Sequence, residues 1–490
     1  MERKSGVLLA VSSLPGPFGI GTMGKQAFAF IDSLKKSGQR LWQILPLSPT
    51  GFGNSPYQSV SAFAGNPDLI DPELLCEDGL LTKEEIETYK KRFDPKIART
   101  QYDLLGEGKR EILYPAFLRA GAQMKREICD FAWENSTWIH DYALYIALSR
   151  ALGTGELAAW PEKLRLRDGA ALIQAACENR TEIDYQIFCQ YIFFRQWDRL
   201  KAYANKNGVS IIGDMPIYVS SDSADRWANR GLFDPEGRVA GCPPDAFAPE
   251  GQLWGNPIYN WDAMKTDGYR WWLGRIGFQL AHYDLVRIDH FRGFEAYWAI
   301  PGTAKSAAEG QWIEGPADDF MDKVVRRFGR ERFIAEDLGS LTDSFFAFMD
   351  RCGMPGLKVL EFAFTPGADS IYLPHRHVKN AVVYTGTHDN DTALGWYRAA
   401  SEEERAFARA YLGTLSERTA AQNLVRAAFA SVCDLCVVPM QDILGLGSDA
   451  RMNTPSTVGS HNWTWRMKEG QFDEKTEEKL LTLTKLYGRY

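Results

Sequence analysis

The sequence of 490 residues contains no hydrophobic run long enough to cross a membrane. Its first apolar segment, GVLLAV at residues 6–11, is shorter than the hydrophobic region of a secretory signal, so we expect no export signal and no membrane contact. An excess of positive charge is also lacking, because 63 acidic residues outnumber 56 lysines and arginines and give a formal net charge of −7. Since nucleic acids and anionic membranes attract basic surfaces, the composition excludes both partners and favours small or neutral ligands.

Cysteine is scarce, with eight residues in the chain and no spacing typical of a disulfide framework. Only Cys433 and Cys436 lie close together, in the apolar run ASVCDLCVVP, which has no second cysteine pair and no histidine nearby. The histidines of HRH at residues 375–377 stand in a polar loop and fit surface residues better than metal ligands. We therefore predict a cytoplasmic protein that uses no metal.

Short apolar runs recur along the chain, each bounded by turn residues and separated from the next by a helix-length pattern. Strands that are apolar throughout, rather than alternating, are typical of a parallel sheet covered by helices. Because there are eight such runs, we predict an α/β fold, a closed (β/α)8 TIM barrel. The predicted strands are residues 6–11, 41–47, 209–214, 284–289, 333–337, 357–362, 381–389 and 435–442.

A barrel of this kind needs about 250 residues, which leaves roughly half of the single catalytic domain, residues 1–490, for insertions. The sequence predicts a mostly helical insertion subdomain at residues 50–205, after the second strand. A second insertion, of a different composition, is predicted at residues 215–283, after the third strand. Only about 50 residues follow the last strand, and KTEEKLLTLTKLY at 475–487 has a helical pattern, so a C-terminal β-sandwich domain does not fit.

Acidic residues follow several predicted strands at their carboxyl ends, where a barrel places its functional groups. One acid after a strand is usually a helix cap or a loop residue, but acids after four neighbouring or near-neighbouring strands indicate a shared site. Such a site has the composition either to bind a divalent metal or to perform proton chemistry on a neutral substrate. The residues are Asp214, Asp289, Glu336, Asp337 and Asp389, with His388 beside the last.

Aromatic residues in the loops favour the second of these alternatives. The chain has 15 tryptophans and 20 tyrosines, and several aromatic residues stand in loops rich in glycine and proline, where no core requires them. Aromatic rings stack well on the apolar faces of sugars, so the sequence predicts a carbohydrate site. The loop residues are Tyr57, Phe247, Trp254, Tyr259 and Trp261.

Chemistry at a glycosidic carbon needs one carboxyl group that holds a proton and a second that stays ionised. Arg287 precedes Asp289 on the same strand face, and a neighbouring guanidinium keeps a carboxylate ionised, so Asp289 is the candidate nucleophile. Glu336 follows the apolar run Phe-Ile-Ala, where burial raises the pKa of a carboxyl group, as a general acid and base requires. Asp389 and His388 are candidates for binding ring hydroxyls and stabilising the transition state.

Other functions remain open on these observations. GIGTMG at residues 19–24 matches a dinucleotide-binding pattern, but seven residues, two of them proline, separate it from the strand, and no acid ends the second strand. A non-catalytic glucan-binding module would keep the loop aromatics but has no use for three acids. The chemistry also leaves a transferase and an α-amylase-type glucan hydrolase as alternatives, because both form the same ester intermediate.

Long motifs throughout the chain resemble those of the 4-α-glucanotransferases, also called amylomaltases or disproportionating enzymes, which are relatives of the α-amylases. The lack of room for a C-terminal β-domain fits this family better than a general amylase. The similar stretches are VRIDHFRG (286–293), AEDLG (335–339) and YTGTHDND (384–391), and they extend through residues 45–67, 213–227, 241–262 and 451–466.

The resemblance implies a retaining transfer of α-1,4-glucan segments to the 4-hydroxyl of another glucan or of glucose, without a cofactor. It implies Asp289 as the nucleophile that forms a β-glucosyl ester, Glu336 as the acid and base, and Asp389 as the transition-state stabiliser. Maltooligosaccharides and α-1,4-glucans are the implied partners, in glycogen or starch metabolism, and the oligomeric state stays open. The implied sugar-contacting residues are Ser55, Tyr57, Asp214, Phe247, Gln252, Trp254, Arg287, His388 and Asn462.

The loop at residues 241–257 resembles the lid that covers the acceptor side of the site in this family. The family often carries an aromatic residue directly after the acid of Pro-Pro-Asp, whereas Ala246 fills that place here and Phe247 follows. We expect any effect of this difference to fall on acceptor preference or product size and not on catalysis.

Overall fold

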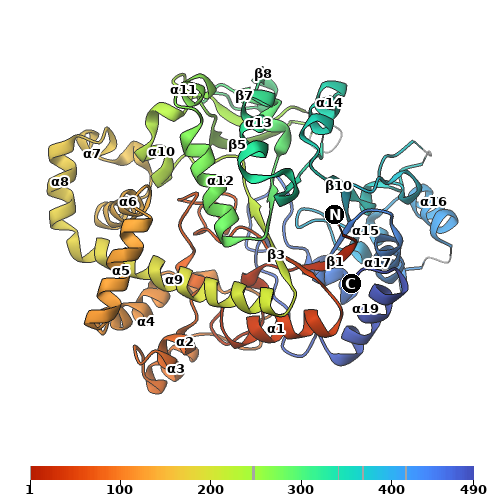
Figure 1. Cartoon of the computed structure of the whole chain (residues 1–490), viewed down its shortest axis with the longest axis horizontal. Coiled ribbons are helices and arrows are strands. Elements are labelled where there is room, and N and C mark those ends of the chain that lie inside the picture. Colours follow the sequence, from red (N-terminus) through yellow and green to blue (C-terminus); the bar gives the residue numbers. More distant parts are fainter. Residues whose placement is uncertain (1, 245–248, 340, 367–368, 414–415) are drawn as a thin grey trace.

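The computed structural model describes residues 2–244, 249–339, 341–366, 369–413 and 416–490, and its centre is a sheet of eight parallel strands. The strands lie in the order β10-β11-β12-β1-β2-β3-β6-β9, so neighbours follow chain order around the sheet, and helices surround them (Figure 1). The predicted TIM barrel is confirmed. Its strands are β1 (Lys4–Leu8), β2 (Leu41–Gln43), β3 (Ser210–Met215), β6 (Leu285–Ile288), β9 (Phe333–Ala335), β10 (Gly356–Val359), β11 (Ala381–Tyr384) and β12 (Leu435–Pro439).

The barrel closes between β9 and β10 partly through a side chain. The backbone N–H of Ala335 donates to the carbonyl of Pro355 at 3.0 Å, just before β10 begins. The N–H of Leu357 donates to Oδ1 of Asp337 at 2.6 Å, so this buried carboxyl group takes the place of a backbone acceptor. Asp337, which the sequence grouped with the acids of the site, therefore belongs to the barrel wall.

Strand side chains are buried on both faces, because helices cover the outside and the inward side chains fill the barrel. Ile211, Val286 and Ile334 are fully buried on three neighbouring strands. At Gly6 the strands β1 and β2 approach so closely that an added Cβ would lie 2.3 Å from the carbonyl oxygen of Leu41. Only glycine fits this position.

The chain between β2 and β3 forms a mostly helical body beside the barrel (Figure 1). Helix α3 begins with a capping box, in which the side chains of Thr82 and Glu85 each accept a hydrogen bond from the other residue's backbone N–H. The long α9 packs against α6 and leads into β3. The helices are α2 (Pro72–Glu77), α3 (Lys83–Lys90), α4 (Glu107–Leu118), α5 (Ala122–Glu134), α6 (Ile139–Leu152), α7 (Glu162–Arg165), α8 (Gly169–Glu178) and α9 (Arg180–Lys206).

A second sheet, antiparallel and in the order β5-β4-β7-β8, was not predicted from the sequence. Its strands are short and come from two separate segments, one after β3 and one after β6, and Val239 of β4 pairs with Ile300 of β7. Local patterns do not reveal such a pairing. The elements here are α10 (Ala224–Ala228), β4 (Val239–Cys242), β5 (Gln252–Pro257), α11 (Trp261–Thr266), α12 (Arg270–His282), β7 (Ala296–Ile300) and β8 (Gln311–Glu314).

The two ends of the chain meet on one side of the barrel (Figure 1). The buried side chain of Arg489 donates to the carbonyls of Phe429 at 2.8 Å and Ser431 at 2.7 Å. Among the helices of the described residues, none is both long and apolar enough to span a bilayer. The remaining helices are α1 (Lys25–Lys36), α13 (Ala317–Phe328), α14 (Asp343–Cys352), α15 (Ala393–Ala399), α16 (Glu402–Leu412), α17 (Ala420–Ala430), α18 (Met440–Ile443) and α19 (Glu474–Leu486).

Candidate active site

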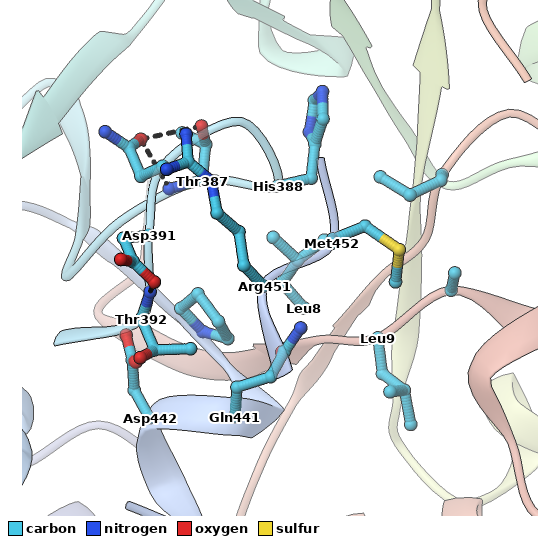
Figure 2. Close-up of a pocket in the computed structure, with 14 residues that line it drawn as sticks. Leu8, Leu9, Thr387, His388, Asp391, Thr392, Gln441, Asp442, Arg451 and Met452 are labelled. Atoms are coloured by element: carbon cyan, nitrogen blue, oxygen red, sulfur yellow. Dashed lines mark hydrogen bonds between the residues drawn. The ribbon is translucent and has the colours of Figure 1, made fainter. Parts of the chain in front are cut away.

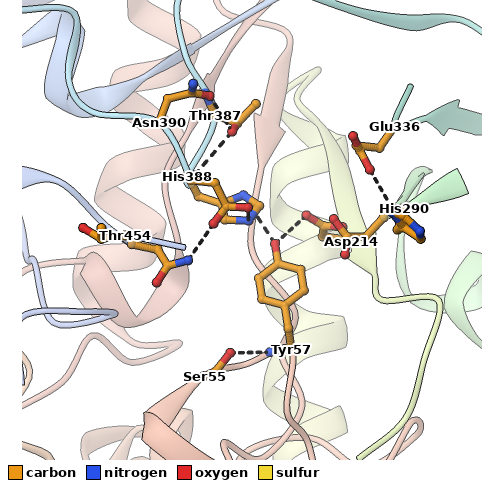
Figure 3. Close-up of polar contacts among 12 residues, drawn as sticks. Ser55, Tyr57, Asp214, His290, Glu336, Thr387, His388, Asn390 and Thr454 are labelled. Carbon is orange, nitrogen blue, oxygen red and sulfur yellow. Dashed lines mark hydrogen bonds and ion pairs between the residues drawn. The ribbon is translucent and has the colours of Figure 1, made fainter. Parts of the chain in front are cut away.

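The acids predicted from the sequence gather at the mouth formed by the carboxyl ends of the barrel strands. Asp214 lies within β3, while Asp289 and Glu336 come directly after β6 and β9. The strand β11 ends at Tyr384, earlier than predicted, so His388 and Asp389 stand in the loop that follows it. Loops in this position bend back over the mouth, which brings these side chains to the same place (Figure 3).

Arg287 holds two of the carboxylates together beneath the site. Its Nη1 lies 2.8 Å from both carboxylate oxygens of Asp214 and 2.9 Å from Oδ1 of Asp289. Arg287 and Asp214 are almost fully buried, whereas the side chain of Asp289 is 26% exposed. The permanently charged guanidinium thus lies beside both carboxylates, and Asp289 is the one that is partly open to the cleft.

Glu336 is the buried acid of the site, at 9% exposure. Burial, helped by the charge of Asp289 and opposed by Arg287, raises the pKa of Glu336 to about 8. Its Oε2 accepts the backbone N–H of His290 at 2.7 Å, and its Oε1 accepts that of Leu338 at 2.9 Å. These bonds fix the orientation of a carboxyl group that holds its proton at neutral pH.

Asp389 has the opposite electrostatic setting. Burial opposes its ionisation, but His388 and the side-chain amide of Asn453 lower the pKa of Asp389 to about 2. Nδ2 of Asn453 donates to Oδ1 at 2.7 Å, and Nε2 of His388 lies 3.4 Å from Oδ2. Burial lowers the pKa of His388, but the negative charge of Asp389 raises it by more. The pKa of His388 therefore lies above its ordinary value. Asp389 is therefore an ionised acid at the mouth.

Tyr57 connects the two sides of the mouth. Its hydroxyl donates to Oδ2 of Asp214 at 2.9 Å and lies 3.4 Å from Nδ1 of His388, and its ring stacks on the imidazole with centroids 4.9 Å apart. Its backbone N–H donates to Oγ of Ser55 at 3.2 Å, which orders the loop after β2 (Figure 3). The half-buried ring of Tyr57 leaves part of its surface to the cleft.

A cleft of about 470 Å³ opens above these residues, between the loops of the barrel and strand β5 of the small sheet. Trp254 on β5 lies across the cleft from the barrel strands, edge-on to His290 at 4.8 Å, and its Nε1 donates to Oε1 of Gln252 at 3.0 Å. The lining is Ser55, Tyr57, Gln58, Pro216, Ile217, Tyr218, Gly251, Gln252, Leu253, Trp254, Asn256, Asp289, His290, His388, Asp389, Asn453, Pro455, Ser456 and Trp463.

Two predicted binding residues differ from the rest. The side chain of Asn462 is buried, accepts from the N–H of Thr454 at 3.0 Å and donates to Thr457, so it folds its own loop and does not line the cleft. Phe247, like the neighbouring Ala246, lies outside the described residues.

Three residues of the cleft were missed in the sequence. Asn453 and Trp463 stand in the similar stretch 451–466 but have no strand end to mark them. His290 adopts a left-handed conformation, with φ of 50°, which turns its backbone N–H toward Glu336. A histidine between the acid and the Phe-Arg-Gly of VRIDHFRG was the available signal for this turn.

A small cavity of about 20 Å³ lies beneath the loop that carries His388 (Figure 2). Asp442 secures this loop, because its Oδ2 accepts from the hydroxyl of Thr385 at 2.5 Å and its Oδ1 accepts from the N–H of Ala393 at 2.7 Å. The cavity therefore borders the contacts that support the loop of His388. Within the described ranges, no group of three or more histidine, cysteine or acidic residues has a geometry that suits a metal ion.

Comparisons with known proteins show the family of the chain. The family model for 4-alpha-glucanotransferase matches residues 9–472. The chain belongs to the 4-alpha-glucanotransferase family. The 4-alpha-glucanotransferases of Streptococcus pneumoniae and Thermus thermophilus are each 44% identical to it, covering 100% of this chain and 98% and 99% of theirs. An amylomaltase from Streptococcus agalactiae, solved in complex with acarbose, is 39% identical over 100% of both chains, with a TM-score of 0.96.

Family membership decides between the functions that the sequence left open. The chain is a retaining glycosyltransferase that moves α-1,4-glucan segments through a glycosyl-aspartate intermediate, as is general for the 4-alpha-glucanotransferases. The predicted transferase is confirmed over the hydrolase, and neither the dinucleotide-binding enzyme nor the non-catalytic module fits a family of transferases.

Proposed function

We propose that Asp289 is the nucleophile and Glu336 the general acid and base of this 4-alpha-glucanotransferase. One observation carries the proposal: of two nearby carboxyl groups, one is ion-paired and open to the cleft, and the other is buried with a raised pKa. Asp289 forms an ion pair with Arg287 at 2.9 Å and is partly open to the cleft. Glu336 is buried, and its pKa of about 8 keeps it protonated at neutral pH. A retaining mechanism requires this difference.

In the first step, a carboxylate oxygen of Asp289 attacks the anomeric carbon of a bound glucan. The bond from that carbon to the glycosidic oxygen breaks, and the proton of Glu336 passes to the leaving oxygen. In the second step, Glu336 takes the proton from the 4-hydroxyl of an acceptor sugar, whose oxygen attacks the same carbon and releases Asp289. Glu336 is then protonated again, and the glucan chain has a new α-1,4 bond.

We infer that Asp389 stabilises the positive charge that develops on the sugar ring. Its pKa of about 2 keeps it ionised over the whole range in which the acid Glu336 is protonated. His388, whose raised pKa favours the charged form, is in position to hydrogen-bond a ring hydroxyl. A carboxylate fixed by Asn453 needs no reorganisation when the charge appears, which is the source of its effect on the rate.

Sugar binding is proposed for the residues along the cleft. The half-buried rings of Tyr57 and Trp254 face the cleft and suit stacking on sugar faces, while Ser55 and Gln252 offer hydrogen-bonding groups. Asp214 and Arg287 act from below, because they are buried and orient Asp289 and Tyr57.

The segment at 241–257 is proposed as a lid, since its strand β5 forms one wall of the cleft. We further propose that residues 1–490 form one catalytic unit in which 50–205 and 215–283 are insertions that shape the cleft. The donors and acceptors are maltooligosaccharides and longer α-1,4-glucans, which places the enzyme in glycogen or starch metabolism. Its eight free thiols suit the cytoplasm.

Incubation with maltotriose alone tests the proposal. The wild type is expected to release glucose together with maltooligosaccharides longer than the substrate, with total reducing ends unchanged. Asp289→Asn and Glu336→Gln should each abolish product formation, while Glu84→Gln on the exposed first turn of α3 should leave it intact. Full activity in Asp289→Asn would refute the assignment of the nucleophile, and a rise in reducing ends would indicate hydrolysis in place of transfer.

A further inference from the structure

A groove of about 660 Å³ lies where the helical insertion meets the segment that follows β3, and its lining comes from the region of α7 and α10. Among the described residues it shares no lining side chain with the active-site cleft, so the transfer reaction makes no use of it. We call it the arginine groove. Its lining is Leu157, Ala158, Arg165, Arg226, Trp227, Arg230, Gly231, Phe233, Asp234, Pro235, Gly237 and Asn260.

The arginines of the groove come from both insertions and are brought together by tertiary contacts. Nε1 of Trp227 donates to the carbonyl of Leu164 at 2.9 Å, which joins the chain beside Arg165 to the chain beside Arg226. Nη1 of Arg230 donates to the carbonyl of Leu166 at 3.4 Å, across the same boundary. The groove therefore exists only when the two insertions are packed together.

Trp227 makes this wall rigid. It packs on Trp160 with ring centroids 5.5 Å apart, and the guanidinium of Arg167 lies 4.3 Å from its centroid. Arg167 is itself ion-paired with Asp141 at 2.6 Å, so it belongs to the wall and does not serve a ligand. A rigid wall keeps the remaining arginines in place before any ligand binds, which favours binding.

The three lining arginines have no acidic partner. Within the described chain, no carboxylate lies within 4.0 Å of Arg165, Arg226 or Arg230, and the side-chain hydrogen bonds of the latter two go to backbone carbonyls. Arg165 and Arg226 are also half-buried. Positive charges that are partly removed from water and left unpaired repel one another, and this costs stability unless an anion binds.

The single acid of the lining does not offset these charges. Oδ1 of Asp234 accepts from Nη2 of Arg238 at 2.6 Å, and Oδ2 accepts from Nε of Arg238 at 3.2 Å, so its charge is already balanced. This local surplus of positive charge stands in a chain whose formal net charge is −7. General basicity of the protein therefore does not explain it.

The chemistry of the groove restricts its ligand. Guanidinium groups bind phosphate oxygens in pairs of parallel hydrogen bonds, more strongly than lysine does. The rings of Trp227 and Phe233 are buried, so no aromatic face is free to stack on a nucleobase. At about 660 Å³ the groove is larger than the glucan cleft of about 470 Å³, which leaves room for sugar rings beside a phosphate group.

We propose that the arginine groove binds a sugar phosphate, either a free hexose phosphate or a phosphorylated glucosyl unit of a glucan. The arginine groove is then a second binding site of the transferase. It recognises a charged group, while the catalytic cleft takes neutral sugars. The phosphate monoester is held by Arg165, Arg226 and Arg230, and its sugar occupies the rest of the groove.

The groove is connected to the wall of the active-site cleft. Nη1 of Arg226 donates to the carbonyl of Ser221 at 3.1 Å, and Oγ of Ser221 donates to the carbonyl of Gly255 at 2.6 Å. Gly255 stands in β5 next to Trp254, which lines the cleft. A ligand on Arg226 therefore acts on a segment that is two hydrogen bonds away from a wall of the catalytic site.

Calorimetric titration of the full chain tests the proposal. The probes are glucose 6-phosphate and maltoheptaose phosphorylated at one 6-hydroxyl, each compared with its unphosphorylated parent, and inorganic phosphate. We expect at least one phosphorylated sugar to bind more tightly than its parent and than inorganic phosphate. The compound that does so distinguishes a free hexose phosphate from a phosphorylated glucan.

Variants connect that binding to the groove. Arg165→Ala/Arg230→Ala is expected to weaken the phosphate-dependent affinity at least about tenfold, because two charged hydrogen-bond donors are lost. Arg165→Glu serves as a second variant, since it removes no hydrogen bond that joins the insertions. Arg326→Ala, on the exposed face of α13, is the matched control and should bind as the wild type does.

All variants should release glucose from maltotriose at the wild-type rate, because none alters the cleft. The proposal is overturned if no phosphorylated sugar binds more tightly than its parent, if inorganic phosphate binds equally well, or if both groove variants retain the affinity.

Discussion

Replacing Glu336 with glutamine removes a titrating group from the floor of the cleft, with an effect on stability that depends on pH. Burial raises the pKa of Glu336 from its ordinary 4.5 to about 8. Between these values the folded wild type keeps a proton that the unfolded chain releases, so its free energy of unfolding falls as pH rises. The slope is about 1.4 kcal/mol for each pH unit, or roughly 4 kcal/mol from about pH 5 to about pH 8.

The glutamine variant has no such slope from this position, so its stability relative to the wild type should grow with pH. A constant loss opposes the gain, because the backbone N–H groups of His290 and Leu338 both donate to Glu336 and glutamine offers only one acceptor oxygen. That loss is about 1–3 kcal/mol at every pH. The test is therefore how the difference in stability between the variant and the wild type changes with pH, and not its size at one pH.

Urea unfolding of Glu336→Gln and the wild type over this pH range provides the measurement, with the transferase assay showing that the variant is inactive. Folded wild type and variant share every other titrating group, so these effects cancel in the difference. A difference in stability that stays flat, or that grows toward acidic pH, would contradict the view that Glu336 is protonated in the folded enzyme at neutral pH.

Three further outcomes follow from the same contacts. The kcat/KM for maltotriose should fall above about pH 8 as Glu336 loses its proton, and a constant rate to pH 10 would exclude it as the acid. Asn453→Ala removes the 2.7 Å hydrogen bond to Asp389 and should lower kcat about tenfold with little change in KM, whereas unchanged initial rates would contradict this role. Asp337→Ala leaves the N–H of Leu357 without its acceptor in the barrel wall, so thermal or urea unfolding should show a loss of about 1–3 kcal/mol, and equal stability would show that water replaces the carboxylate.

Much of the barrel was predictable because it depends on local patterns. An apolar run of strand length between two helix patterns has few alternatives, and all eight predicted runs form barrel strands. The strand ends were less predictable, because the chain leaves the sheet at the points where its side chains turn toward the site. The predicted strand 381–389 ends at Tyr384, which frees Asp389 to turn over the mouth.

The small antiparallel sheet was not predictable, because its central pair, β4 with β7, joins segments on opposite sides of β6 and each strand is short. The sequence also did not indicate that Asn462 stabilises its own loop while Asn453 donates a hydrogen bond to Asp389. Two asparagines in one loop differ only in their surroundings in the folded chain. The arginine groove was not predictable either, because its side chains come from two insertions that are separate in the sequence.

By itself, the amino-acid sequence determined which strands form the barrel and which acids stand at their carboxyl ends, because parallel strands bring those ends to one rim. It determined through its motifs that the chain resembles the 4-alpha-glucanotransferases. Only the tertiary structure decided the electrostatic surroundings of each acid: Arg287 reaches Asp289, Asn453 reaches Asp389, and the packed chain removes Glu336 from water. Charge states depend on neighbours within a few ångströms, and those neighbours are far apart in the sequence.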